Sequence, residues 1–162
     1  SRGLGDVYKR QAYALYERYI MEKHADGDMF PPDREQYESF LNNSLGCTRY
    51  FRLYDKDRLV CVAVSDQMLD GLAAIYTFYD PELDKRSLGT FAVLLQISHA
   101  KKLGLPYVYL GYWIDGCRKM SYKTRFKPLE MLSNGRWHGD GDSSTSGLST
   151  IPVVNVSRDA RD

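Results

Sequence analysis

The sequence has few of the residues that build metal knuckles and disulfide frameworks. Three cysteines and three histidines occur among 162 residues. Cys47, Cys61 and Cys117 stand far apart with no CxxC pair, so we expect reduced thiols and neither a disulfide framework nor a bound metal. His24, beside two aspartates, stays open as a catalytic base or a metal ligand, although a histidine at a helix end more commonly interacts with the helix dipole.

Long apolar runs are also absent. No stretch reaches the roughly 18 to 20 residues that a membrane helix needs, and residues 1–11 contain no apolar segment of the signal-peptide kind. We therefore expect a cytoplasmic protein without a membrane partner. The length and the 43% of hydrophobic residues suffice for one ordinary domain with a buried core.

The two ends of the chain differ in composition from its middle. Residues 1–11, SRGLGDVYKRQ, have no usable periodicity, and we expect them to be a non-native leader outside the domain. Residues 139–162 begin with a run of Gly, Asp, Ser and Thr that buries too little apolar surface to become ordered. We therefore expect a disordered or poorly ordered tail, and a domain over residues 12–138.

Hydrophobic periodicity within residues 12–138 predicts an α+β fold. Residues 12–25 and 31–41 have helical spacing, residues 49–80 have the pattern of three strands, and residues 88–104 that of a buried central helix. A strand at 106–113, a short helix at 117–126 and a final strand or hairpin at 128–137 follow. This order matches an acetyltransferase-like fold, with a mixed, mostly antiparallel sheet and flanking helices, although a fold alone does not determine function.

Positive charge is concentrated in one segment of a nearly neutral chain. The 22 Lys and Arg almost match the 21 Asp and Glu, yet five basic residues and no acid fall between Arg118 and Lys127. On a helix, Lys119 and Lys123 lie four residues apart and Arg125 follows, which makes a basic stripe. A solvated face is the usual alternative, but such a face normally mixes charges of both signs. The segment therefore favours a phosphate-bearing partner.

Aromatic residues with hydrogen-bonding groups are abundant. The chain contains 13 tyrosines, and Tyr112 and Trp113 directly precede the basic segment. Their rings could hold a base or an apolar side chain, and positive charge beside a stacking surface favours the end of a nucleic acid. For any single tyrosine, a half-buried strand position is an equally good interpretation.

The entrance to the predicted central helix, RSLGTF at residues 86–91, half matches an acyl-CoA loop. In such a loop, backbone N–H groups and a helix N-terminus hold pyrophosphate. Arg86 and Gly89 fit this pattern, but the bulky Phe91 occupies its last small position and should crowd a pyrophosphate. The loop can still hold another anion or a sugar; the alternative is an ordinary helix start capped by Ser87.

Three segments carry a family resemblance: YERYIMEKHADGDMFPP, YTFYDPELDKRSLGTFAVLLQI and LGYWIDGCRKMSYKTRFKPLEML, with Trp137 closing a match over residues 12–137. They resemble the C-terminal half of the aminoacyl-tRNA–protein transferases, the arginyl- and leucyltransferases of the N-degron pathway. The segment HADGDMFPP most resembles the bacterial aspartate/glutamate leucyltransferases. The resemblance implies an acetyltransferase-like fold and transfer of an amino acid from tRNA to the N-terminal residue of a protein, which marks that protein for degradation. It also implies that the N-terminal domain of such an enzyme is missing, so we expect a fragment.

The resemblance further implies roles for individual residues. An aminoacyl ester is already activated, so transfer needs positioning and oxyanion stabilisation, with no nucleophilic side chain and no cofactor. Arg86 and Gly89 are expected at the tRNA 3′ end, and Asp80 and Trp113 at the acceptor. A cation for an acidic acceptor side chain is expected from Arg86 or the basic segment. The residues expected at acceptor-stem phosphates are Lys119, Lys123, Arg125 and Lys127, and those expected near the reacting carbonyl are Tyr76, Tyr112 and Tyr122.

The donor and acceptor follow from the same resemblance. We expect leucine from leucyl-tRNA, transferred to proteins with N-terminal Asp or Glu. Arginyl transfer is the close alternative, because the donor depends on the surroundings of Tyr112 and Trp113. An acyl-CoA N-acyltransferase of the same fold and a non-catalytic tRNA-binding fragment stay open as well.

Overall fold

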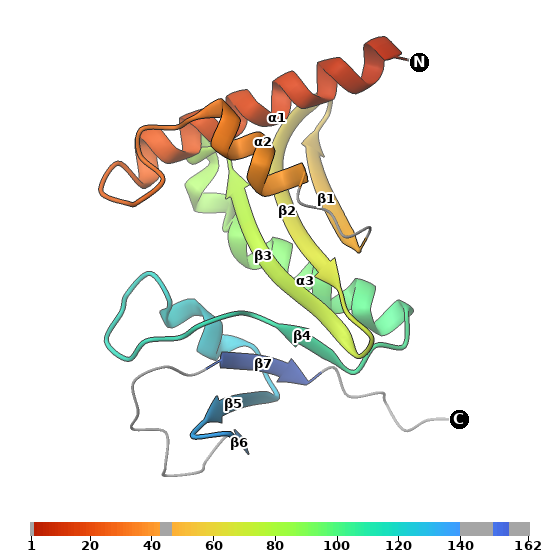
Figure 1. The fold of residues 1–162 in the computed structure, drawn as a ribbon, viewed down its shortest axis with the longest axis vertical. Coiled ribbons are helices and arrows are strands. Elements are labelled where there is room, and N and C mark those ends of the chain that lie inside the picture. The colour runs from red at the N-terminus through yellow and green to blue at the C-terminus, as the bar shows by residue number, and fades with distance from the viewer. Residues whose placement is uncertain (1, 43–46, 140–150, 156–162) are drawn as a thin grey trace. The chain divides into compact units, whose positions relative to one another are not determined.

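The structure, a computed structural model, describes residues 2–42, 47–139 and 151–155 (Figure 1). Its α-helices are α1 (Arg2–Lys23), α2 (Arg34–Asn42) and α3 (Leu88–Lys102), and its 3-10 helices are η1 (Pro81–Arg86) and η2 (Ser121–Arg125). Its strands are β1 (Thr48–Asp55), β2 (Arg58–Gln67), β3 (Gly71–Tyr79), β4 (Tyr107–Tyr109), β5 (Leu129–Ser133), β6 (Arg136–Gly139) and β7 (Ile151–Asn155). No helix in these ranges has the length and apolar character needed to cross a membrane.

The chain divides into two compact units. Unit 1 comprises Ser1–Val64 and Tyr76–Ala92, and unit 2 comprises Ser65–Ile75 and Val93–Asp162. Helices and strands occur in both units, so the predicted α+β class is confirmed.

Unit 1 packs helices on both faces of its strands. Strands β1, β2 and β3 are hydrogen-bonded neighbours. On one face, apolar side chains of α1 and α2 form a core with β2 and β3, made of Leu15, Tyr16, Tyr19, Ile20, Tyr37, Leu59, Val62, Val64 and Phe78. On the other face, Val60, Cys61 and Ala63 pack against Leu88 and Ala92 at the start of α3. Burial of these two clusters is the main source of stability for the unit.

Unit 2 contains a sheet with the order β3-β4-β7-β5-β6. Strand β4 is parallel to β3, with Gly71 opposite Tyr107, and β7 is antiparallel to both β4 and β5. Parallel pairing requires a crossover connection, which α3 supplies. Gly71 is required by close packing, because an added Cβ would lie 2.6 Å from the carbonyl oxygen of Tyr107.

Most predicted elements are confirmed. The two N-terminal helices, the three strands and the central helix all lie where periodicity placed them. Gly104, two residues after the end of α3, has a left-handed φ of 68°. Asn134 and Gly135 have φ values of 50° and 73° and join β5 to β6, as expected for a two-residue hairpin turn.

The predicted helix at residues 117–126 is wrong. The backbone there makes successive three-residue turns, for example from the N–H of Lys123 to the carbonyl of Met120 at 3.1 Å, and η2 is a short 3-10 helix. Side chains satisfy backbone carbonyls in this segment: Ser121 Oγ donates to Arg118 at 2.9 Å, and Thr124 Oγ1 donates to Ser121 at 2.9 Å. Such bonds compete with the α-helical ladder.

The two ends differ from what their composition suggested. Helix α1 extends back to Arg2, so residues 2–11 are helical. Within the expected tail, Ile151–Asn155 form β7 and pair with β4 and β5. Composition could not indicate this strand, because its partners are distant in sequence. Residues 140–150 and 156–162 lie outside the described residues, and the domain limits at 12 and 138 stay a prediction.

Candidate functional site

The predicted site residues fall into two groups. Unit 1 holds Tyr76, Asp80, Arg86 and Gly89, whereas unit 2 holds Tyr112, Trp113, Lys119, Tyr122, Lys123, Arg125 and Lys127. The second group is contiguous within residues 112–127. That stretch is the larger concentration of candidate residues.

Because the basic segment forms three-residue turns, its side chains are aligned differently from those of the expected α-helix. In 3-10 geometry, residues three apart are aligned. Lys119 and Lys123 are four residues apart, a spacing that three-residue turns do not align. Lys123 is half-buried, while Lys119 and Arg125 are exposed. The predicted stripe, with Lys119 and Lys123 on one helix face, is therefore wrong.

Lys123 connects η2 to the loop that follows β4. Its Nζ donates a hydrogen bond to the carbonyl oxygen of Tyr112 at 2.6 Å. Burial lowers the pKa of Lys123, and the nearby Cys117 opposes this shift to a smaller extent. Gly111 has a left-handed φ of 76°, and a Cβ added there would lie 3.9 Å from the Lys123 Nζ. The bend at Gly111 thus lies beside the ammonium group.

The remaining basic residues of the segment are exposed. Arg118, Lys119, Arg125 and Lys127 all lie at the surface. Within the ranges that the structure describes, neither Arg118 nor Arg125 has an acidic partner. Exposed charge of one sign attracts phosphates and makes binding depend on salt.

Three aromatic side chains accompany this charge. The Tyr112 side chain is 64% exposed, so its ring is available for stacking. Trp113 is half-buried, and its Nε1 is buried without a hydrogen-bond partner in the described part of the chain. The Tyr122 ring packs edge-on against Phe126, with centroids 6.5 Å apart.

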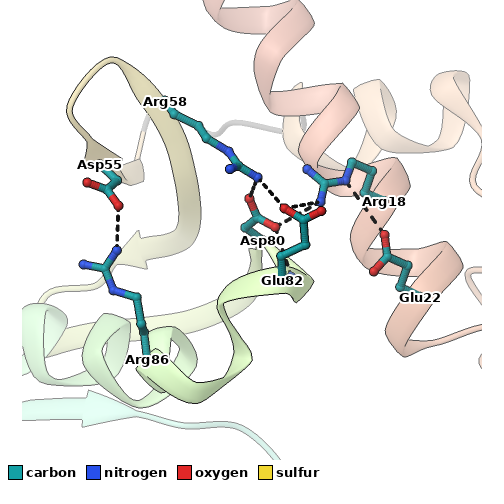
Figure 2. Close-up of polar contacts among 7 residues, drawn as sticks. All are labelled: Arg18, Glu22, Asp55, Arg58, Asp80, Glu82 and Arg86. Atoms are coloured by element: carbon teal, nitrogen blue, oxygen red, sulfur yellow. Dashed lines mark hydrogen bonds and ion pairs between the residues drawn. The ribbon is translucent and has the colours of Figure 1, made fainter.

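In unit 1, Asp80 is buried in an ion-pair network (Figure 2). Its carboxylate has no exposed surface, accepts a hydrogen bond from Arg18 Nη2 at 3.1 Å and is paired with Arg58. It also caps η1 by accepting from the backbone N–H of Glu82 at 3.1 Å. Hydrogen bonding to Arg58 and the charge of Arg18 lower the pKa of Glu82. Asp80 thus holds η1 in place, a geometry that does not support the predicted contact with an acceptor amine.

Arg86 and Gly89 lie on either side of the entrance to α3. Arg86 Nη1 donates to Asp55 Oδ2 at 2.8 Å in an exposed ion pair (Figure 2). Ser87, the residue before α3, has a left-handed φ of 52°. A Cβ added to Gly89 would lie 3.5 Å from the Tyr79 ring, an ordinary contact, so packing does not require glycine there. The tRNA-binding roles of Arg86 and Gly89 stay predictions.

Tyr76 belongs to the aromatic core of unit 1. Its ring lies 6.4 Å from that of Tyr16 and 6.2 Å from that of Phe78. Burial raises the pKa of Tyr76 to about 12. The hydroxyl is therefore protonated near neutral pH, where it can donate a hydrogen bond but cannot act as a base.

Sequence reasoning missed Arg18 and Arg58. No local signal links them to Asp80, because Arg18 is 62 residues and Arg58 is 22 residues away along the chain. Among the described residues, no cluster of three or more His, Cys, Asp or Glu side chains is arranged to hold a metal ion.

Comparison with known proteins gives a family match and close relatives. Residues 11–133 match the family described as arginine-tRNA-protein transferase, C terminus. The chain is 51% identical over 136 residues to the aspartate/glutamate leucyltransferase of Stutzerimonas stutzeri (strain A1501), a match that covers 84% of this chain and 58% of that protein. It is 48% identical over 140 residues to the aspartate/glutamate leucyltransferase of Alcanivorax borkumensis, covering 86% and 58%. The chain thus spans less than two thirds of the length of these relatives.

Solved structures show the same fold at low identity. The ribosomal-protein-S18-alanine N-acetyltransferase from Escherichia coli matches with a TM-score of 0.60 and 16% identity, covering 94% of this chain and 91% of that one. A GNAT-family acetyltransferase from Staphylococcus aureus Mu50 matches with a TM-score of 0.60 and 15% identity, covering 92% and 94%. These matches confirm the predicted acetyltransferase-like fold, and at such identity they show the fold alone.

Proposed function

The chain belongs to the family of the arginine-tRNA-protein transferase C terminus, and from this premise we propose that it transfers leucine from leucyl-tRNA to proteins with N-terminal Asp or Glu. The observation that carries the proposal is its 51% identity, over 84% of the chain, to an aspartate/glutamate leucyltransferase. The remaining part of such an enzyme is a proposed partner, because the chain spans 58% of that relative. The proposed location is the cytoplasm, where charged tRNA and N-degron substrates meet.

The proposed reaction exchanges an ester for an amide. The neutral α-amine of the acceptor attacks the aminoacyl carbonyl carbon, the new C–N bond forms, and the ester C–O bond breaks. The amine loses a proton, and the ribose oxygen of the tRNA leaves as a hydroxyl that has gained one. Because the ester is already activated, the protein's task is to position both substrates and stabilise the oxyanion.

The basic segment supports tRNA binding. Arg118, Lys119, Arg125 and Lys127 offer exposed charge of one sign, and the exposed Tyr112 ring offers a stacking surface for a terminal base. Phosphate contacts of this kind fix the register of a nucleic acid without reading its sequence.

Arg86, the Gly89 backbone and the Tyr76 hydroxyl, all in unit 1, are proposed to contact the aminoacyl end. The ion pair between Arg86 and Asp55 is exposed, and such pairs contribute at most about 1 kcal/mol. A phosphate can therefore replace Asp55 at low cost. A protonated tyrosine hydroxyl is a suitable donor to a developing oxyanion.

The test is transfer of radiolabelled amino acid from charged tRNA to a peptide that begins with Asp. The chain is assayed alone and together with the remaining part of a relative's enzyme. Leucine transfer is the expected result. Arginine transfer would correct the donor, and acyl transfer from acyl-CoA would replace the reaction class. Binding of tRNA without transfer under either condition would leave a tRNA-binding fragment and overturn the proposal.

A further inference from the structure

The 3-10 helix η1 lies between β3 and α3 and depends on other elements for its geometry. It has 6 residues, which is long for a 3-10 helix, and it is kinked at Leu83, whose φ and ψ of −96° and 22° are not helical. Ser87 alone separates it from α3 and has a left-handed φ of 52°. A change in the direction of η1 would therefore move the entrance to α3.

Asp80 fixes the start of η1 (Figure 2). Its buried carboxylate is paired with Arg18 from α1 and with Arg58 from β2. It also accepts a hydrogen bond from the backbone N–H of Glu82 at 3.1 Å. The same two guanidinium groups contact the Glu82 carboxylate at 3.5 and 3.0 Å. One buried carboxylate thus joins η1 to two other elements of unit 1.

A second ion pair holds the part of η1 that lies next to α3. Asp84 Oδ2 lies 2.9 Å from the Nζ of Lys23, in the last turn of α1. The backbone carbonyl of Asp84 accepts from the N–H of Ser87 at 3.2 Å. The carbonyl of Ser87 in turn accepts from the N–H of Phe91, in α3, at 3.0 Å. A continuous chain of contacts thus runs from α1 through η1 into the first turn of α3.

Arg86 and Gly89, the groups proposed at the aminoacyl end, belong to these two elements. Arg86 is the last residue of η1, and Gly89 lies in the first turn of α3. The ion pair of Arg86 with Asp55 is exposed, and such a pair holds its side chains only weakly. The position of the Arg86 guanidinium therefore depends mainly on the backbone of η1.

We propose that Asp80 is a positioning residue for the transfer reaction: through η1 it sets where Arg86 and the Gly89 backbone meet the aminoacyl end of the tRNA. This inference rests on the proposed function. The Asp80 carboxylate has no exposed surface and is used by Arg18, Arg58 and a backbone N–H, so it acts through η1 and makes no substrate contact. Its charge is essential to this role, because hydrogen bonds between ionised groups are about twice as strong as neutral ones.

Asp80→Asn removes this charge with almost no change of shape. The amide oxygen still accepts the N–H of Glu82, but the amide has no charge to pair with the guanidinium groups. In steady-state transfer by the chain together with the remaining part of a relative's enzyme, KM for leucyl-tRNA should rise about tenfold, the loss of one charge-assisted hydrogen bond to the substrate. The kcat should change by less than about twofold, since ground state and transition state lose the same contact.

A purely structural role gives the opposite pattern. Partial unfolding of Asp80→Asn lowers the concentration of active enzyme, and the apparent kcat then falls while KM stays the same. The ratio of the two effects therefore distinguishes positioning of the substrate contact from support of the fold.

A double-mutant cycle tests whether Asp80 acts through Arg86. Arg86→Ala should by itself raise KM about tenfold. In that background Asp80→Asn should add less than about threefold, because the main contact that Asp80 positions is already lost, whereas independent effects would multiply. Glu38→Gln is the matched control. It removes another carboxylate of unit 1 that pairs with an arginine, at 3.1 Å within α2, and should leave KM unchanged.

Arg58 provides a second pair of variants, which test the same network from its exposed side. The Arg58 side chain is 51% exposed, so its replacement threatens folding less than that of Asp80. Arg58→Met removes one of the two cations on Asp80 and should raise KM by about threefold. Arg58→Lys retains a cation with three N–H donors and should restore KM to within about twofold.

Three results would overturn the positioning role. These are a lower kcat at unchanged KM in Asp80→Asn, increases in KM that multiply in the double variant, and an unchanged KM in Arg58→Met. The proposed function fails separately. Fluorescence anisotropy of labelled leucyl-tRNA gives the Kd for the same proteins of the cycle. A Kd that follows the expected pattern without leucine transfer would refute the transferase and retain the role of Asp80 in tRNA binding.

Discussion

Arg18 of α1 and Asp80, at the start of η1, lie with Nη2 and Oδ1 3.1 Å apart, although the carboxylate has no exposed surface. We predict that Asp80→Ala lowers the free energy of unfolding by about 1 to 3 kcal/mol. The substitution removes the side-chain cap of η1 and the carboxylate that pairs with the guanidinium groups of Arg18 and Arg58. It stays below that of a fully buried pair because the side chains of Arg18 and Arg58 are 39% and 51% exposed. Urea denaturation measures it.

Asp55→Ala is the matched control for Asp80→Ala. Asp55 also pairs with an arginine in unit 1, but both side chains of its ion pair with Arg86 are exposed. Its removal should cost less than about 1 kcal/mol. Equal costs for the two variants would contradict the argument that burial makes Asp80 important.

Charge on the basic segment should control the salt dependence of tRNA binding. Arg118→Ala and Arg125→Ala should each weaken binding and reduce the slope of log affinity against log salt by about one. Arg34→Ala, which removes an exposed arginine from α2, is the control and should leave the slope unchanged. Fluorescence anisotropy across a salt series measures all three. A slope unaffected by the first two variants would remove the segment from the tRNA interface.

Buried tyrosines should make unit 1 sensitive to alkaline pH. Burial raises the pKa of Tyr37 and of Tyr76 from 10.0 to about 12. Between these values the unfolded chain has released the phenol protons and the folded chain retains them. The folded state then binds more protons, so stability falls as pH rises from about 10 to 12. Below pH 10 their contribution is fully present.

Phenylalanine substitutions test this sign. Unfolding free energies of Tyr37→Phe and Tyr76→Phe should fall less steeply between pH 10 and 12, by at most about 1.4 kcal/mol per pH unit for each phenol. Tyr54→Phe, on an exposed position of β1, is the control. Identical slopes for all three variants would show that other groups cause the alkaline loss.

Local pattern was enough to predict much of the fold. Helical spacing in α1 and α3, the strand pattern of β1 to β3, and the Asn134-Gly135 turn are all encoded by neighbours in sequence. The 3-10 turns of η2 were not predicted; there, Ser121 and Thr124 donate side-chain hydrogen bonds to backbone carbonyls, which compete with the α-helical ladder. That change from an α to a 3-10 repeat separated Lys123 from Lys119.

The candidate site was predictable in composition but not in arrangement. A run of five basic residues is visible in the sequence, and so is the aromatic pair before it. The half-burial of Lys123, whose Nζ donates to the Tyr112 carbonyl, is not visible in the sequence. The partners of Asp80 were equally hidden, since they come from α1 and β2 through tertiary contact.

Deletion of residues 151–162 should disrupt unit 2. The deletion removes β7 and leaves facing edges of β4 and β5 without hydrogen-bond partners. We expect faster hydrogen exchange in both strands and self-association, because unpaired strand edges recruit other chains. Deletion of residues 156–162 alone spares β7 and serves as the control. Exchange that is unchanged by the longer deletion would contradict this role for β7.

The place of β7 also imposes an order on biosynthesis. A ribosome releases β4 first, then the β5–β6 hairpin, and only later the strand that lies between them. Until Asn155 has left the exit tunnel, β7 cannot pair with β4 and β5, so the β5–β6 hairpin is not yet joined to β4. By then all residues of unit 1 have been synthesised, because that unit ends at Ala92. During this interval unit 1 is fully synthesised, whereas the sheet of unit 2 lacks β7, its central strand. A chaperone that covers the unpaired edges of β4 and β5 would therefore act mainly at this stage.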